Sequence, residues 1–478
     1  MKKTLAIAGI FLLSVNLTSG QFIDGSPGRV RACPDLPFKQ IGTIRPRTVH
    51  EIESSNWTIG CEVLDRDYAN FDSYKEFLPL LGIKKIRLQG GWAKTEKQRG
   101  VYNWAWLDSI IDFATANGLK PWLQTSYGNP VYDSGGMNLG GSIPLTEEAL
   151  AGWDRWVEAM VTRYRDKVTE WEMWNEPDGN KENTPERIAE FNIRTAEMIL
   201  RIQPDAEIAG LAMASGNNTG YLDRYLKVLS EKGKLDLFKW IVYHGYTMNP
   251  DDNYIGQAKL DSVLRKYSDK LKLRQGENGA PSGYCNGFAL KKYHWTEISQ
   301  AKWDARRMLG DLGRDIESSV FSIIDMYYQS NHTLNVKGLI QSDSTLKAIR
   351  PKVAYYTVQH IASVFDHNLE RITNFSYQVK SPESVSAFAY RSKKTGKQVV
   401  SLWFDGNIPN DNFVTQNVEI TVKGGDFSTP VWVDLLSGRI YRIPGADWHK
   451  SGGGYTFRIP LYDSPVLISD ISLIPVQK

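Results

Sequence analysis

Two glutamates in patterned stretches are the residues best suited to chemistry. Glu176 stands in WEMWNEP, residues 171–177, where an aromatic run ends at an amide, a carboxylate and a proline. Pro177 has no backbone N–H to donate, so regular strand pairing is expected to stop there. Glu277 stands in a second stretch, LRQGENGAP, residues 273–281. A carboxylate beside an amide and tryptophans suits an acid that cleaves sugar bonds, and the plain alternative is an Asn-Glu-Pro turn.

The elements that must position these glutamates form a repeating pattern of eight short apolar runs alternating with helical segments. The runs are 58–62, 85–89, 121–126, 168–174, 207–212, 240–243, 272–275 and 321–326. Apolar residues three to four apart predict helices over 71–81, 104–117 and 298–316, and Thr184 with Pro185 begins another that Pro204 ends. Eight strand–helix units predict a (β/α)8 TIM barrel. A doubly wound sheet is less favoured, because no Gly-rich phosphate loop follows an early strand.

In such a barrel the chemistry gathers at the C-terminal ends of the strands. Glu176 ends strand four and Glu277 ends strand seven, so their carboxylates are expected to face each other across the barrel mouth. Two facing carboxylates suit a double displacement, in which one protonates the leaving oxygen and the other attacks the anomeric carbon. Carboxyl groups about 5–5.5 Å apart would indicate retention of configuration, and a gap near 8 Å inversion.

The order of these motifs resembles glycoside hydrolase clan A, whose members are retaining glycosidases with two catalytic glutamates. The resemblance rests on WNEP after strand four and on a lone Glu ending strand seven, and it covers residues 57–365. With the added β domain, family 39 and its neighbours are the most similar in appearance. The resemblance implies hydrolysis of β-glycosidic or α-L-arabinofuranosidic bonds of an oligo- or polysaccharide. By position, Glu176 matches the acid/base, Glu277 the nucleophile and Asn175 the amide that contacts the sugar 2-hydroxyl.

Further residues match or support this site. Arg87 on strand two resembles the clan's arginine that keeps the nucleophile ionised, and an ion pair inside the barrel is an equal alternative. Glu172, on the same face of strand four as Glu176, is expected to point inward and meet Arg87. His244 and Tyr246 in YHGY match a His-x-Tyr motif of the clan, in which the tyrosine hydroxyl binds the nucleophile. A dry surrounding is expected to raise the pKa of the acid Glu176.

Several aromatic and amide residues at loop positions are candidates for lining the sugar site: Tyr127, Asn129, Trp92 and Trp295. Trp92 would form a stacking wall, whereas Tyr127 and Asn129 would line the site or form a Gly-Asn-Pro turn. Clan barrels often end strand eight near a Trp. Here the stretch SIIDMYYQ has none, which makes Tyr327 or Tyr328 the expected substitutes.

Outside the barrel, predicted for residues 56–365, three segments have distinct patterns. Residues 1–20 resemble a cleavable export signal, with Lys2 and Lys3 before a short apolar run, so a secreted or periplasmic protein is expected. Residues 21–55 are expected to be irregular. Residues 366–478 alternate with period two between Gly, Asn and Pro turns, which predicts an antiparallel β-sandwich.

Composition restricts the partners. The formal charge of +3 comes without a basic run, which favours neither nucleic acid nor an anionic membrane, and no second apolar stretch is long enough for a membrane anchor. No metal-ligand spacing and no GxSxG elbow is present, and the expected mechanism needs no metal or other cofactor. Among the three cysteines, a Cys33–Cys61 disulfide and buried thiols are equal alternatives. A non-catalytic carbohydrate-binding protein is the alternative function.

Overall fold

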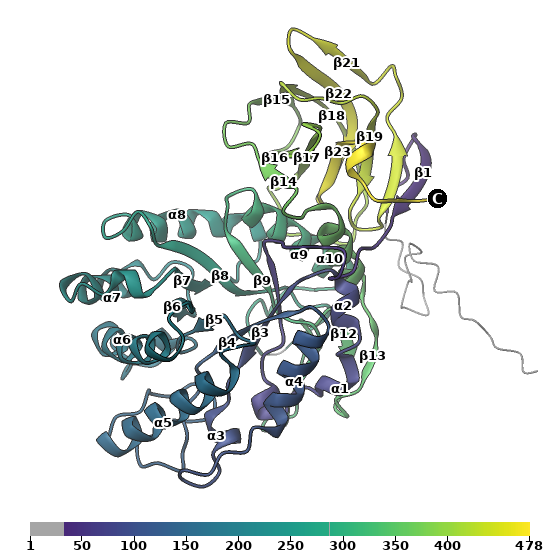
Figure 1. Ribbon diagram of the computed structural model, residues 1–478. Coiled ribbons are helices and arrows are strands. Elements are labelled where there is room, and N and C mark those ends of the chain that lie inside the picture. Colours follow the sequence, from purple (N-terminus) through teal and green to yellow (C-terminus); the bar gives the residue numbers. More distant parts are fainter. Residues whose placement is uncertain (1–32, 286) are drawn as a thin grey trace, which may run out of the picture.

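The computed structural model describes residues 33–285 and 287–478, which fold into a barrel with an all-β part beside it (Figure 1). The predicted export signal, residues 1–20, lies outside the described residues. Eight parallel strands close the barrel in chain order: β2 (Trp57–Gly60), β3 (Lys85–Gln89), β4 (Lys120–Gln124), β5 (Glu170–Glu172), β6 (Glu207–Met213), β7 (Trp240–His244), β8 (Lys272–Asn278) and β9 (Glu317–Val320). The predicted (β/α)8 barrel is confirmed.

Helices between the strands surround the barrel: α1 (Phe71–Tyr74), α2 (Phe77–Leu81), α3 (Trp92–Thr95), α4 (Ala105–Ala116), α5 (Glu147–Tyr164), α6 (Pro185–Ile202), α7 (Thr219–Glu231), α8 (Asn253–Leu264), α9 (Glu297–Leu312) and α10 (Val353–Val364). The predicted start of α6 is confirmed, because the Thr184 side chain accepts from the backbone N–H of Arg187. The predicted helix 71–81 is interrupted instead. Pro79, within α2, has no N–H to donate to the carbonyl of Lys75, so the helix is interrupted one turn earlier, at Lys75 and Glu76.

The eighth barrel strand lies earlier in the chain than the sequence predicts. The apolar run 321–326 indicates strand eight, but β9 ends at Val320. The strand contains Ser318 and Ser319, both buried. The Ser318 hydroxyl donates to the Asp311 carboxylate at 2.7 Å, which satisfies its hydrogen bonding away from water. The prediction was wrong because it relied on apolar residues alone.

The all-β part is a sandwich of two antiparallel sheets, as predicted. The larger sheet has the order β14 (Leu369–Arg371), β16 (Val385–Ser392), β17 (Gln398–Phe404), β23 (Val466–Asp470), β19 (Pro430–Asp434), β20 (Arg439–Arg442), β1 (Lys39–Ile44) and β24 (Val476–Gln477). The smaller has the order β15 (Tyr377–Lys380), β18 (Gln416–Lys423), β22 (Gly454–Leu461) and β21 (Trp448–Ser451). Two hairpins follow β9, formed by β10 (Met326–Tyr328) with β11 (Thr333–Asn335) and by β12 (Ile340–Ser342) with β13 (Ala348–Pro351).

The segment 21–55, expected to be irregular, contributes a strand to the sandwich within its described part. β1 pairs with β20 and β24, and its register shifts between Gln40 and Gly42. A bulged strand breaks the alternation on which strand prediction depends, which is why the sequence did not indicate it. Cys33 lies against Tyr441 of β20 with its sulfur 3.5 Å from the hydroxyl, whereas Cys61 follows β2 in the barrel. The two cysteines are therefore not joined by a disulfide.

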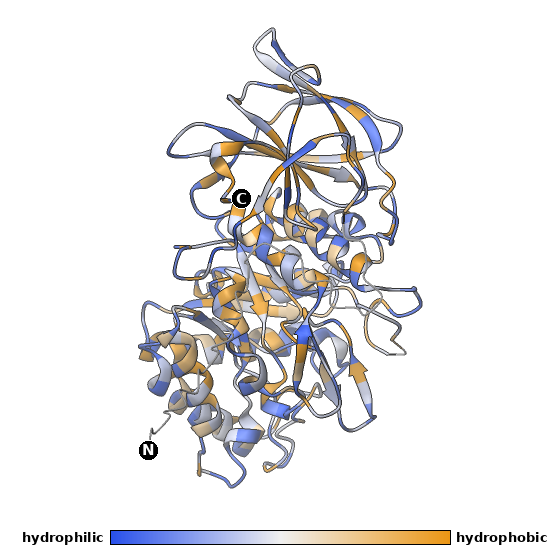
Figure 2. Cartoon of the chain, turned by 90° about the vertical axis from the view of Figure 1, so that its right-hand side faces the viewer, coloured by the Kyte–Doolittle hydropathy of each residue, from blue (hydrophilic) through white to orange (hydrophobic). Residues whose placement is uncertain are grey.

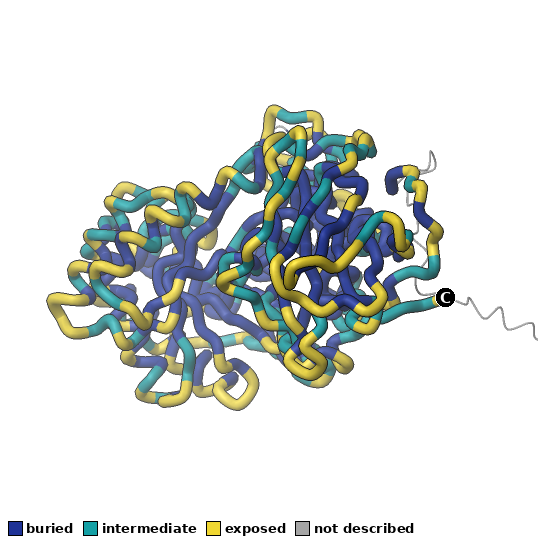
Figure 3. Tube along the Cα trace, turned by 90° about the horizontal axis from the view of Figure 1, so that it is seen from above, coloured by how far each residue is buried: buried dark blue, intermediate teal, exposed yellow. Residues whose placement is uncertain are grey.

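Hydrophobic segments concentrate in the interior of both parts, whereas loops and hairpin tips are hydrophilic (Figure 2). The buried chain runs through the middle of each part when the molecule is seen from above (Figure 3). Most of the tryptophans are fully buried: Trp57, Trp92, Trp122, Trp153, Trp156, Trp171, Trp174, Trp240, Trp303, Trp403 and Trp432. The high aromatic content therefore mainly builds the core.

The sandwich packs on α9 and α10 through buried polar contacts. On α9, Lys302 pairs with Asp463 at 2.6 Å, and both its ammonium and the nearby carboxylate are largely hidden from water. On α10, the imidazole Nδ1 of His360 lies 2.9 Å from the carbonyl oxygen of Leu435. Such contacts fix the sandwich to the outer helices of the barrel. Within the described residues, no helix combines the length and apolar character needed to cross a membrane.

Candidate active site

Glu176 and Glu277 stand at the C-terminal ends of β5 and β8, two barrel strands that β6 and β7 separate. Glu176 follows β5, and its backbone is left-handed, with φ 50° and ψ 48°. This conformation costs roughly 1–2 kcal/mol for a residue with a Cβ. Pro177 then begins a short 3-10 helix, Pro177–Gly179. β5 ends at Glu172, two residues before the end of the predicted run 168–174, and the predicted turn at Glu176 and Pro177 follows it.

The two glutamates meet at His244, which ends β7. The imidazole Nδ1 lies 2.8 Å from Oε1 of Glu176 and 3.6 Å from Oε2 of Glu277. One oxygen of each carboxylate and the imidazole nitrogen all lie within 4.8 Å of one another. Among the described residues this is also the set of acidic and histidine groups close enough to share a metal ion. Its members come from three strands, so no local spacing in the sequence displays it.

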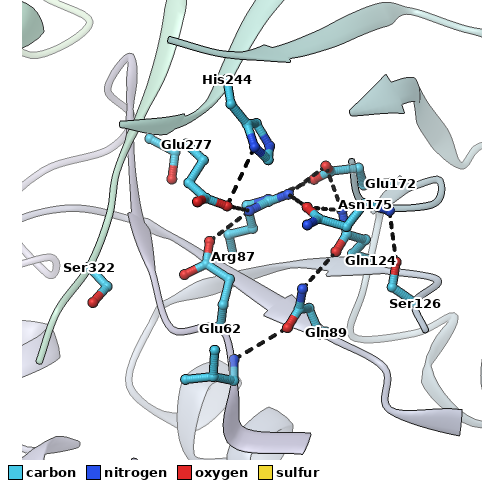
Figure 4. Close-up of polar contacts among 12 residues, drawn as sticks. Glu62, Arg87, Gln89, Gln124, Ser126, Glu172, Asn175, His244, Glu277 and Ser322 are labelled. Carbon is cyan, nitrogen blue, oxygen red and sulfur yellow. Dashed lines mark hydrogen bonds and ion pairs between the residues drawn. The ribbon is translucent and has the colours of Figure 1, made fainter. Parts of the chain in front are cut away.

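Arg87 of β3 is fully buried at the centre of a carboxylate network (Figure 4). Its Nε and Nη2 donate to the two oxygens of Glu172 at 2.9 and 2.8 Å. Nη2 also donates to Asn175 Oδ1 at 2.9 Å. Nη1 donates to Glu62 at 2.8 Å and to Glu277 at 3.3 Å. Arg87 therefore forms the interior ion pair that the sequence offered as one alternative, and it also contacts Glu277.

Glu62, which follows β2, was not among the residues selected from the sequence. It is 4% exposed, and its Oε2 has no hydrogen-bond partner. Burial and the charge of Glu277 outweigh the attraction of Arg87 and raise the pKa of Glu62 to about 7. Gly60 makes room for it, because a Cβ at that position would lie 2.2 Å from Glu62 Oε2. Its place at the end of the predicted first strand was the available signal.

Tyr246 lies where the sequence predicts. Its hydroxyl donates to Glu277 Oε1 at 2.8 Å, so this carboxylate receives hydrogen bonds at both oxygens. Tyr127 supports the site indirectly, because its hydroxyl accepts from Asn175 Nδ2 at 2.7 Å. Gln124 Nε2 donates to Asn175 Oδ1 at 3.1 Å. The amide of Asn175 is therefore held in one orientation from both ends.

The pKa values of Glu176 and His244 shift in opposite directions, which favours a proton on the imidazole over one on the carboxyl group. Burial would raise the pKa of the Glu176 carboxyl, but the hydrogen bond and charge of His244 outweigh burial and lower it. Burial likewise disfavours the charged imidazolium, but Glu277 and Glu176 outweigh it and raise the pKa of His244. The expectation that dryness raises the pKa of Glu176 is thus wrong for this arrangement, because it did not include the His244 imidazole, whose Nδ1 lies 2.8 Å from the carboxylate.

Three predicted lining residues lie in the packed interior instead. Trp92 is fully buried and stacks on Tyr132 with ring centroids 5.3 Å apart, so no ring face is open to a sugar. Trp295 is 3% exposed and donates its indole N–H to the carbonyl of Leu290. Asn129 donates to the backbone carbonyl of Glu96 at 2.8 Å. All three side chains are buried, and none of them lines the cavity beside the glutamates.

A cavity of about 480 Å³ opens beside the glutamates. Its wall is formed mainly by loops after β6, β7, β8 and β9, and includes Glu176, Asn217, His244, Tyr246, Glu277, Phe288, Phe321, Tyr328 and Lys337. Of the two substitutes expected near strand eight, Tyr328 lines the cavity, and Tyr327 instead contacts His332. Phe321, the first residue after β9, also lines the cavity. The sequence did not indicate this, because the eighth strand was predicted at 321–326, which puts Phe321 at the start of the strand and not after its end.

Solved structures share this architecture. A family 39 glycoside hydrolase from the gut symbiont Bacteroides cellulosilyticus WH2 superimposes with a TM-score of 0.61 at 18% identity, covering 87% of this chain and 80% of that one. A family 30 subfamily 8 xylanase from Clostridium acetobutylicum gives 0.55 at 14% identity, covering 90% and 97%. The chain has the fold of clan A glycoside hydrolases.

The likeness extends to a third family within this group. A family 51 α-L-arabinofuranosidase from Bifidobacterium longum gives a TM-score of 0.53 at 12% identity, covering 91% of this chain and 98% of that one. The chain matches no protein-family model and no curated protein sequence. At such identities the likeness concerns the fold, so the chemistry has to be argued from the site.

Proposed function

We propose that this protein is a retaining glycoside hydrolase, with Glu277 as nucleophile and Glu176 as acid/base. The observation that carries the proposal is the approach of their carboxylate oxygens to within 4.8 Å. Retaining enzymes hold the two carboxyl groups about 5–5.5 Å apart, whereas inverting enzymes need about 6.5–9.5 Å to admit a water. The substrate is a β-glycosidic or α-L-arabinofuranosidic bond of an oligo- or polysaccharide.

In the first step a Glu277 oxygen attacks the anomeric carbon while the bond to the leaving oxygen breaks. Arg87 and Tyr246 hold the attacking carboxylate through its two oxygens, at 3.3 and 2.8 Å, which limits its rotation. Asn175, whose amide orientation is fixed, contacts the sugar 2-hydroxyl. In the second step a water attacks the glycosyl–enzyme ester and releases Glu277.

The proton for the leaving oxygen comes from the Glu176–His244 pair, which titrates as a unit. With the cavity open to water, the proton sits on His244. A bound sugar displaces water and makes the separated charges of the pair less favourable. The proton then moves from Nδ1 to Oε1 across 2.8 Å, and Glu176 passes it to the leaving oxygen. In the second step Glu176 takes a proton from the attacking water.

The test is release of sugar from a panel of aryl glycosides and plant polysaccharides. Glu277→Gln and Glu176→Gln are expected to abolish release, while Glu182→Gln, the same change at an exposed position, preserves it. Added azide should restore turnover to a Glu277→Gly variant with the inverted anomer as product. NMR of the first product of the unchanged enzyme should show the substrate's configuration.

An inverted first product would remove Glu277 as the nucleophile. Binding of glycans without any turnover across the panel would instead support a non-catalytic carbohydrate-binding protein. We further propose that the protein acts outside the cytoplasm, on the strength of the export-signal pattern in residues 1–20. Cleavage of that segment on expression in a bacterial host, followed by N-terminal sequencing of the product, tests this.

A further inference from the structure

Three lysines are almost completely buried in the described chain, and one differs from the other two. Lys302 pairs with Asp463 and Lys352 with Asp325, each at 2.6 Å. Lys337 is 1% exposed, yet among the described residues no carboxylate lies within 4.0 Å of its ammonium. Its Nζ donates to the backbone carbonyl of Ala289 at 2.7 Å.

The surroundings of Lys337 suit a cation that awaits an anion. The ring centroids of Tyr246 and Phe288 lie 5.7 and 5.8 Å from its Nζ, within reach of weak cation–π attraction. Burial lowers the pKa of Lys337 to about 8, so the group stays mainly charged at neutral pH. An ammonium has three N–H donors, and one carbonyl satisfies one of them.

Leaving a charge buried without a partner costs several kcal/mol, which is why buried charges in proteins are normally paired. The backbone around Lys337 is firmly held, since the Gln300 amide donates to the Lys337 carbonyl at 3.1 Å. The side chain stands in the wall of the cavity that also contains Glu176 and Glu277. A ligand in this cavity is therefore able to supply the missing negative charge.

We propose that Lys337 binds an anionic substituent of the sugar substrate, either a uronic acid carboxylate or a sulfate ester. This inference deepens the proposed glycosidase function and rests on it. The ring of Tyr246 lies between Lys337 and the nucleophile, with its hydroxyl on Glu277 and its centroid 5.7 Å from Nζ. The anionic group thus belongs to the sugar unit at, or directly beside, the bond that is cleaved.

A simpler role for Lys337 is to anchor the loop at Ala289. Anchoring explains the hydrogen bond to Ala289, but an anchor needs no positive charge. A neutral side chain could form that bond without the cost of burying a charge. The two roles differ in what they predict for substrates. An anchor is indifferent to the charge of the glycan, whereas an anion-binding lysine discriminates between glycans that differ in charge alone.

The experiment uses matched glycan pairs with the full-length protein. Glucuronoxylan is compared with its carboxyl-reduced form, and a sulfated galactan with its desulfated form. We expect the unchanged protein to prefer one acidic member by roughly tenfold to hundredfold in kcat/KM, the range of a charge-assisted hydrogen bond. Lys337→Met should reduce this preference at least tenfold, and Lys337→Arg should keep part of it. Lys347→Met, the same change at an exposed lysine, is the control.

Each outcome has one meaning. Preference for the carboxylated member identifies a uronic acid, and preference for the sulfated member identifies a sulfate ester. Equal turnover of both members in both pairs refutes the anion site while leaving the glycosidase intact. If nothing is cleaved, the glycosidase proposal fails, and calorimetry with glucuronate and glucose sulfate then tests the anion site by itself. Binding that is lost in Lys337→Met supports the anion site, and absence of binding refutes it. A Lys337→Met variant that does not fold is replaced by Lys337→Arg and Lys337→Gln in the same comparison.

Discussion

Replacing Glu62 by Gln removes one of three carboxylates that share the single guanidinium of Arg87. The amide keeps an oxygen to accept from Nη1 but carries no charge. Glu62 has its pKa raised to about 7 from an ordinary 4.5, so the folded state favours the protonated form. The free energy of unfolding that this raised pKa contributes is fully present below pH 4.5. It decreases as the pH rises toward 7 and is absent above pH 7.

The magnitude follows from the pKa difference. At 1.36 kcal/mol per pKa unit, the change from 4.5 to about 7 corresponds to about 3 kcal/mol, of which about 2–3 kcal/mol is lost between pH 5 and pH 8. The Gln variant has no such dependence. Relative to the unchanged protein, it should therefore become more stable by about 2–3 kcal/mol on going from pH 5 to pH 8, whatever the amide itself costs.

The assay is guanidinium unfolding followed by tryptophan fluorescence at pH 5 and pH 8, with both proteins measured side by side. Glu231→Gln, the same substitution at an exposed position on α7, is the control and should show no pH-dependent difference. The reasoning is refuted if the free-energy difference between Glu62→Gln and the unchanged protein is the same at both pH values within about 0.5 kcal/mol.

Three further outcomes are expected. Arg87→Met should destabilise the protein by about 3–5 kcal/mol in the same assay, because it leaves several buried carboxylates without their cation; a loss below about 1 kcal/mol would contradict this. Tyr246→Phe should lower kcat/KM roughly tenfold to hundredfold by removing the hydrogen bond to Glu277, and unchanged kinetics would count against that bond. Burial lowers the pKa of His360 to about 4 from 6.5, so the free energy of unfolding should fall by about 3 kcal/mol as the pH decreases from 6.5 toward 4. His360→Gln should lack this pH dependence, and equal pH dependence of the two proteins in acid unfolding would refute the prediction.

The local sequence pattern alone determines much of the architecture. Alternating apolar runs and amphipathic helices specify strand–helix units, and eight such units close in only a few ways, so the barrel followed from periodicity. The sites of Glu176 and Glu277 followed with it, because strand ends of a parallel barrel converge on one face. The start of α6 at Thr184 and Pro185 is equally local, since a cap depends on neighbouring backbone groups.

Where the local pattern misled, burial of polar groups or partners distant in sequence decided the outcome. β9 is polar in sequence and becomes a core strand because Asp311 satisfies Ser318. The sequence predicts Trp92 as a stacking surface, but in the structure other aromatic rings stack on it, among them Trp156 of α5 with ring centroids 6.0 Å apart. The opposite pKa shifts of Glu176 and His244 depend on a 2.8 Å contact between residues of different strands, which no spacing along the chain records.

The sequence by itself therefore determined which strands carry the two glutamates, because periodicity and turn chemistry act over a few residues. Only the tertiary structure decided what surrounds them. Glu62 joins the network through Arg87, and Lys337 enters the cavity wall from a loop beyond the barrel strands. Charge and burial are properties of the assembled neighbourhood, since both depend on atoms brought together from across the chain.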